Sequence, residues 1–147
     1  MFTRVLIIGA GPAGLSTAFH LQNTDYLLLE MGSSIEARDH NDPTDSIIGV
    51  GGAGLFSDGK FSFYPAGTAV WNLKTPELEQ AYIALQSSMA DYLQVPNFPE
   101  EIKSGYTRPD KWFLKKYPCM YLTLDQRRSY VNSLTSKIPA SNLLLQH

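Results

Sequence analysis

The chain has 147 residues, the length of one domain at the usual ~100–200 residues per domain, and 44% of them are hydrophobic while 18% are charged. Its formal net charge of −2 at pH 7 lacks the basic excess that nucleic-acid binding requires, and doublets such as Arg127-Arg128 are interpreted as solvated faces. The single cysteine, Cys119, excludes an internal disulfide and a metal site built on several thiolates.

No stretch of the sequence approaches the ~18 consecutive apolar residues that a membrane-spanning helix needs. The apolar run near the N-terminus, Val5–Ile8, stops at a glycine turn, which is typical of a strand and not of a signal peptide. A lone cysteine fits a reducing compartment. We therefore expect a soluble, cytoplasmic protein without a metal site, one that binds neither nucleic acid nor a membrane.

The first part of the chain predicts a strand, a glycine turn, a helix and a second strand. Val5–Ile8 is apolar without alternation, as expected of a central parallel strand that is covered on both faces. A helix is expected from Pro12 to about Gln22, and Tyr26–Glu30 predicts a second buried strand. A right-handed crossover would make the two strands parallel neighbours.

Gly9, Gly11 and Gly14 have the spacing G-x-G-x-x-G between the first strand and the helix. In this motif the first glycine permits a tight turn, the second lets a pyrophosphate approach the backbone, and the third lets helix and strand pack closely. The helix N-terminus favours phosphate, and Glu30, about 20 residues further on, is placed to accept hydrogen bonds from an adenosine ribose. The pattern predicts a dinucleotide site; the carboxylate disfavours NADP, and a glycine turn without a ligand is the alternative.

A second glycine-rich stretch distinguishes FAD from NAD as the expected ligand. Residues 33–46 are polar and predict a loop, so the strand–helix alternation of an NAD-type half-domain does not continue. Residues 49–59 then hold five glycines in eleven residues, which would let the backbone approach a flat ring or a phosphate. Such a loop would lie along the ribityl and isoalloxazine parts of FAD, and a ligand-free surface loop is the alternative.

The remainder of the chain predicts a second group of elements. Residues 61–71 suggest a hairpin, and a helix is expected from the N-cap candidate Thr75 to about Gln94. Residues 97–120 are irregular by pattern and rich in aromatic side chains. A capping box at Thr123–Gln126 starts a helix that runs to about residue 137, and residues 142–147 predict a final strand.

The glycine motif and Glu30 together resemble the FAD-binding start of the glutathione-reductase-like flavoprotein superfamily. The run from Gly51 to Lys60, GGAGLFSDGK, resembles more narrowly a group of poorly characterised FAD-dependent dehydrogenases. The resemblance covers roughly residues 3–62 and, more weakly, residues 123–147, which are similar to the stretch that returns a flavoprotein chain from its cap to the FAD domain.

This resemblance implies an α/β fold in which a Rossmann-type βαβ unit with a parallel sheet is followed by an incomplete α+β cap region. Residues 1–60 would bind FAD, residues 61–121 would form the cap-like, substrate-side region, and residues 122–147 would return to the FAD-binding sheet. The residues implied at the pyrophosphate are Gly9, Gly11, Pro12, Ala13 and Gly14; Glu30 would bind the ribose, Arg38 the adenosine-phosphate portion, and Gly51, Gly52 and Ser57 the flavin side.

The sequence departs from these flavoproteins in two ways. No Cys-x-x-Cys or Cys-x-x-x-x-Cys pair follows the second glycine stretch, so disulfide reductase chemistry is not supported. The relatives also complete the FAD site with a C-terminal strand and helix from far along the chain. The sequence is therefore interpreted as an N-terminal fragment, a truncated product or half of a split protein, with a missing C-terminal half or a partner chain as its expected partner.

The function predicted from these residues is that of an FAD-dependent oxidoreductase, or a fragment of one, with an unknown small-molecule substrate. The isoalloxazine carries the electrons in such an enzyme, so no protein nucleophile is required, and the sequence identifies no catalytic residue. Two alternatives remain open: an NAD-binding Rossmann protein, and a non-catalytic nucleotide-binding remnant or module.

Overall fold

The computed structural model describes residues 3–99, 105–107, 113–114 and 116–147. The chain divides into two compact units. The first combines Met1–Gly59 with Thr123–His147, and the second is Lys60–Leu122. Within the described ranges, no helix is long and apolar enough to cross a membrane.

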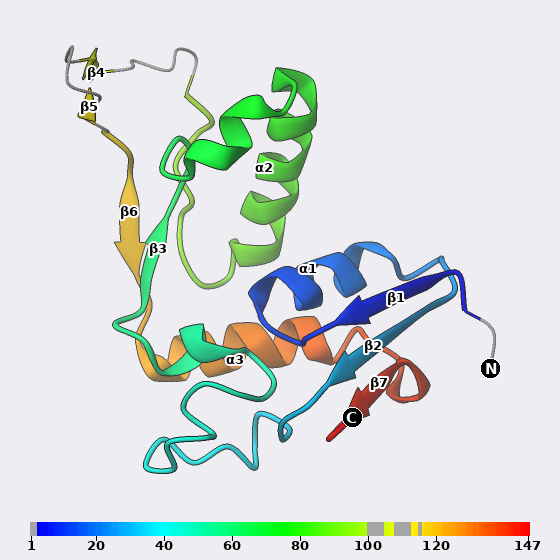
Figure 1. The fold of residues 1–147 in the computed structure, drawn as a ribbon. Helices are drawn as coiled ribbons and strands as arrows, with labels where there is room; N and C mark the ends of the chain where they lie inside the picture. Colours follow the sequence, from blue (N-terminus) through cyan, green and yellow to red (C-terminus); the bar gives the residue numbers. More distant parts are fainter. Residues whose placement is uncertain (1–2, 100–104, 108–112, 115) are drawn as a thin grey trace. The chain divides into compact units, whose positions relative to one another are not determined.

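The first unit is built on a parallel sheet of three strands, in the order β1 (Val5–Ile8), β2 (Tyr26–Glu30) and β7 (Leu143–Leu145) (Figure 1). Helix α1 (Pro12–His20) connects β1 to β2, so the predicted strand–helix–strand order and the parallel pairing are confirmed. The predicted last strand is also confirmed as β7, which pairs with β2. The fold is therefore a mixed α/β fold with a parallel sheet.

Helix α3 (Leu124–Thr135) brings the chain back to this sheet. Its start is the capping box expected from the sequence: Gln126 N donates to Thr123 Oγ1 over 3.2 Å, and Thr123 N donates to Gln126 Oε1 over 2.9 Å. These reciprocal bonds satisfy two backbone donors that have no partner inside the helix. A short 3₁₀ turn, η3 (Ala140–Asn142), then leads into β7.

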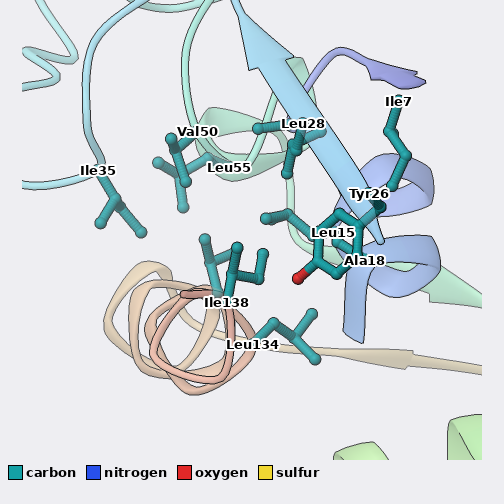
Figure 2. Packing of buried hydrophobic residues seen from close by; sticks show 12 residues of the cluster. Ile7, Leu15, Ala18, Tyr26, Leu28, Ile35, Val50, Leu55, Leu134 and Ile138 are labelled. Atoms are coloured by element: carbon teal, nitrogen blue, oxygen red, sulfur yellow. The ribbon is translucent and has the colours of Figure 1, made fainter. Parts of the chain in front are cut away.

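The core of the first unit lies where α1 and α3 meet one face of the sheet (Figure 2). Leu15 and Ala18 of α1 and Leu134 of α3 pack with Leu28 of β2 and Ile7 of β1. Burial of each large aliphatic side chain contributes about 1.5–3 kcal/mol. The loop before the second glycine stretch joins the same core through Ile35, and the stretch itself joins it through Val50 and Leu55.

The expectation that β1 is covered on both faces is wrong. Ile7 points into the core, but Leu6 is 53% exposed and Ile8 is 82% exposed. The physical reason is that both helices contribute their side chains to the face that holds Ile7, while the side chains of Leu6 and Ile8 point to the opposite face. An apolar run predicts a strand that can be buried on both faces, but it does not supply the layer that would cover the second one.

The second unit differs from its prediction at two places. Strand β3 (Lys60–Ser62) forms no hairpin with the residues after it but pairs antiparallel with β6 (Cys119–Tyr121). Residues of the expected second hairpin strand form a 3₁₀ helix instead, η2 (Thr68–Asn72). The pairing continues beyond the strand because Phe63 N donates to Pro118 O over 3.0 Å.

Helix α2 (Thr75–Met89) is shorter than the predicted helix, and its N-cap is Lys74 rather than Thr75. Both Tyr92 N and Leu93 N donate to Met89 O, so the chain turns there and does not continue to Gln94. The stretch expected to be irregular contains a short antiparallel pair, β4 (Gly105–Thr107) and β5 (Phe113–Leu114). Other positions of that stretch, 100–104, 108–112 and 115, lie outside the described residues.

Candidate functional site

The first glycine turn leaves β1 at its carboxyl end, and its fold requires two of the three motif glycines. Gly9 has φ = +94°, in the left-handed region that favours glycine, and its N–H donates to Leu29 O over 2.7 Å. A Cβ added at Gly14 would lie 1.9 Å from Gly9 O, inside the backbone of the turn. These two glycines therefore have a structural explanation that involves no ligand.

Gly11 has no such explanation. It is the N-cap of α1 with an ordinary φ of −72°. Among the described residues, the nearest atom to an added Cβ would be Gly52 Cα at 4.0 Å, which is an ordinary contact. No side chain of the described residues caps the start of α1, and both Pro12 and Ala13 at this helix end are exposed. The helix N-terminus thus presents backbone and open space at the position where the motif would hold a pyrophosphate.

Glu30 lies at the carboxyl end of β2 and is only 5% exposed. Its Oε2 accepts a hydrogen bond from Ala10 N over 2.7 Å. Its Oε1 accepts from Gly32 N over 2.9 Å and from Gly49 N over 3.1 Å. A carboxylate has about four acceptor positions, so the described residues leave one position on Oε2, which a hydroxyl of a ligand could take. The same carboxylate joins the ends of β1 and β2 to the second glycine stretch.

The second glycine stretch lies directly against the first. Gly51 N donates to Ala10 O over 2.8 Å, and a Cβ added at Gly52 would come within 3.1 Å of Gly11 Cα. Gly51 and Gly52 have φ values of +91° and +62°, which other residues rarely adopt. The two glycine segments therefore form one backbone surface at the carboxyl edge of the parallel sheet, the edge at which α/β folds bind their ligands.

Arg38 holds the second glycine stretch by its carbonyl groups. The side chain is 3% exposed. Its Nη1 donates to Val50 O over 2.8 Å and to Gly52 O over 2.9 Å, while Nε and Nη2 donate to Asp45 O. The guanidinium also lies 4.9 Å from the centre of the Phe56 ring, within cation–π range.

Burial lowers the pKa of the Arg38 guanidinium, against the opposing effect of the charges of Asp45 and Glu30. Four of its five N–H donors are used by backbone carbonyls. The structure thus places Arg38 in a role that fixes the loop, whereas the resemblance implied a place near the adenosine phosphate.

Arg127 is a site residue that the sequence analysis missed, and its interpretation as a solvated residue is wrong. It is 8% exposed and extends from α3 to the end of the second glycine stretch. Its Nε donates to Leu55 O over 2.9 Å and its Nη2 donates to Ser57 O over 3.0 Å. The signal in the sequence was its spacing from Val131 and Leu134, which places all three on one face of a helix.

Ser57 closes the turn at the end of this stretch. Its hydroxyl donates to Gly54 O over 2.8 Å and accepts from Gly59 N over 3.2 Å. The side chain is exposed. The structure therefore gives the hydroxyl a local partner on each side, and any contact of Ser57 with a ligand would be additional to these bonds.

An open cavity of about 210 Å³ lies beside Glu30. Its walls combine the carboxylate with apolar side chains, including Ile8, Met31 and Ile47, and with backbone of both glycine segments. Pockets that hold drug-sized ligands measure about 300–1,000 Å³, so this cavity suits one part of a larger ligand. Its mixture of a hydrogen-bond acceptor and apolar walls is suited to a ribose with an attached base.

Most of the predicted site residues are brought together at this edge. The residues that gather are Gly9, Gly11, Pro12, Ala13, Gly14, Glu30, Gly51 and Gly52, with Arg38 bonded to the loop and Ser57 at its far end. In the described part of the chain, no three His, Cys, Asp or Glu side chains are grouped so that they could hold a metal ion.

By its fold the chain is a mixed α/β protein with a three-stranded parallel sheet and a glycine-rich carboxyl edge. No protein-family model matches the sequence, and no curated protein matches it significantly.

Proposed function

We propose that the first unit binds the dinucleotide FAD, as the N-terminal portion of an FAD-dependent oxidoreductase. When bound, the isoalloxazine would supply the redox chemistry, and the residues of this chain bind and orient the cofactor. The adenosine ribose would bind to the open position on Glu30 Oε2, and the pyrophosphate would lie at Gly11 and the start of α1.

The observation that carries this proposal is the unexplained Gly11. Gly9 is needed for its backbone angle and Gly14 for its contact with the turn, but the described residues leave room for a side chain at Gly11. Glycine at this position is explained if a ligand must approach the backbone closely, which is the role of the second glycine in the dinucleotide motif. A turn without a ligand would accept serine or aspartate there, which are at least as good at an N-cap.

Two further features support the proposal. Glu30 keeps an acceptor position beside a cavity of about 210 Å³, as ribose binding requires. The exposed side chains of Leu6 and Ile8 leave an apolar face on the sheet, which supports the expectation that a further segment or a partner chain covers it.

The test is a titration of the purified 147-residue chain with FAD, NAD⁺, NADP⁺ and ADP, each added separately to cofactor-free protein. We expect FAD to remain bound after gel filtration near a one-to-one ratio, and ADP to compete with it. Gly11→Ala and Gly11→Val should weaken binding at least tenfold. The unfolding free energy of Gly11→Ala should fall by no more than about 1 kcal/mol, the cost of alanine at an N-cap.

Gly67→Ala is the matched control, because Gly67 has an ordinary φ of −81° and an added Cβ would meet Val70 Cγ2 at 3.7 Å. It should bind FAD as the wild type does. Equal binding by wild type and Gly11→Val would contradict the proposal. Retention of NAD⁺ but not FAD would favour an NAD-binding protein, and nucleotide binding without turnover of any electron donor would favour a non-catalytic module.

A further inference from the structure

The second glycine stretch is held by an unusual set of side chains. Of the described residues, the buried polar or charged ones are Glu30, Arg38 and Arg127. Each of them bonds to backbone of this stretch. Glu30 accepts from Gly49, Arg38 donates to Val50 and Gly52, and Arg127 donates to Leu55 and Ser57.

The stretch follows a definite course along the candidate site. Gly49 lies beside the Glu30 carboxylate, and Gly52 lies against Gly11. A Cβ added at Gly54 would then lie 3.9 Å from Pro12 Cγ, at the first turn of α1. The chain therefore passes the position of the ribose, then that of the pyrophosphate, and next reaches residues 55–57.

Residues 55–57 are consequently the part of the stretch beyond the pyrophosphate position. A ligand with its adenosine at Glu30 and its pyrophosphate at Gly11 would extend its other half toward them. ADP ends at the pyrophosphate and would not extend so far. The bonds within the stretch are long here: Leu55 N donates to Gly52 O over 3.2 Å and Ser57 N donates to Gly54 O over 3.3 Å.

Arg127 supplies the stronger bonds at this place. Its two donors lie 2.9 Å and 3.0 Å from the carbonyl oxygens of Leu55 and Ser57. Hydrogen bonds from a guanidinium are roughly twice as strong as those between neutral groups, and the planar group fixes both oxygens at once. The arginine itself is fixed because α3 packs in the core through Val131 and Leu134.

We propose that Arg127 is a positioning residue for the non-adenosine half of the dinucleotide, and that the adenosine half does not depend on it. This inference rests on the proposed function. It predicts that the site discriminates between FAD and ADP through a residue on α3 that bonds to Leu55 and Ser57.

The experiment compares Arg127→Lys and Arg127→Gln with the wild-type chain in parallel titrations with ADP and FAD. Lysine keeps the charge, but its single ammonium group cannot reproduce the fork that holds two carbonyl oxygens. We expect the affinity for FAD to fall at least tenfold while the affinity for ADP changes less than twofold. The absorption band of the bound flavin should also shift. Lys137→Gln, which removes an exposed cation just beyond α3, should change neither affinity more than twofold.

An equal loss of ADP and FAD affinity would overturn the inference, because Arg127 would then act on the whole fold. Unchanged FAD affinity in both variants would overturn it as well. If even Arg127→Lys fails to fold by far-UV circular dichroism in the presence of ADP, the residue serves folding and the inference is wrong. A wild-type chain that binds neither ligand would instead refute the proposed function, and the two failures are thereby distinguished.

Discussion

Replacement of Glu30 by glutamine should destabilise the first unit far more than its nearly identical shape suggests. The carboxylate accepts from Ala10 N, Gly32 N and Gly49 N over 2.7, 2.9 and 3.1 Å. Glutamine has one acceptor oxygen. Its best placement keeps this oxygen on the Gly32 and Gly49 side and turns the amide NH₂ toward the Ala10 N–H, so that two donors face each other.

The expected magnitude follows from these three bonds. Loss of the charge-assisted bond to Ala10 N costs about 1.5–3 kcal/mol, and conversion of the other two bonds to neutral ones costs about 1 kcal/mol each. We therefore expect Glu30→Gln to lose about 3.5–5 kcal/mol of unfolding free energy, a large share of the 5–15 kcal/mol typical of a domain. Glu36→Gln, at an exposed position nearby, should change it by less than about 0.5 kcal/mol.

Urea unfolding followed by far-UV circular dichroism measures this loss, provided that the slope with urea stays unchanged. Amide hydrogen exchange gives a second, local measurement, since the amides of Ala10, Gly32 and Gly49 should exchange faster in the variant. A loss below about 1 kcal/mol with all three amides still protected would show that the carboxylate does not hold these strands and the loop together.

Three further substitutions test the fold by the same urea assay. Gly14→Ala should cost about 2–3 kcal/mol or more, because its Cβ would lie 1.9 Å from Gly9 O, whereas Gly67→Ala should cost almost nothing. Tyr26→Phe should add about 1 kcal/mol, because the buried Tyr26 hydroxyl has no hydrogen-bond partner among the described residues. Burial raises the pKa of Tyr26 from its usual value of 10.0, so this hydroxyl ionises less readily in the folded chain than in the unfolded one. The unfolding free energy of the wild type should therefore stay constant below pH 10 and fall as the pH rises beyond it. The phenylalanine variant should lose less stability there, and an equal loss would refute the assignment. Thr123→Ala should cost about 1 kcal/mol through loss of the capping box, and a neutral result would show that the box contributes nothing.

The parts of the fold that the sequence predicted are those with local signals. The capping box at Thr123 and Gln126 is specified within four residues, and it formed as expected. The strands β1 and β2 are separated by a single helix, so their parallel pairing follows from the short connection. The glycine spacing likewise located the turn at the carboxyl end of β1.

The failed predictions concern partners that come from elsewhere in the chain. Strand β3 looked like half of a hairpin, but its partner β6 lies beyond α2, and no pattern in residues 61–71 could indicate that. The exposure of Leu6 and Ile8 depends on which layers cover the sheet, which the composition of the strand does not determine.

The candidate site was predicted in outline, while its bonding pattern was not. The motif indicated Glu30 as a ribose ligand, but it gave no sign that the carboxylate also binds three backbone amides. Arg127 was misinterpreted because its neighbour in the doublet, Arg128, suggested a solvated face. The helical spacing of Arg127, Val131 and Leu134 carried the opposite signal, and all three are buried.

The fixed conformation of the second glycine stretch has an energetic cost. Ordering each backbone residue costs about 1–2 kcal/mol, and glycine, having the greatest freedom, costs the most. Removing a charge from water adds several kcal/mol unless hydrogen bonds compensate for it. A ligand-free surface loop could remain mobile and avoid both costs, yet here Glu30, Arg38 and Arg127 are buried to fix one loop. The proposed function would account for this arrangement, because a loop already held in its bound form loses less entropy when a ligand arrives.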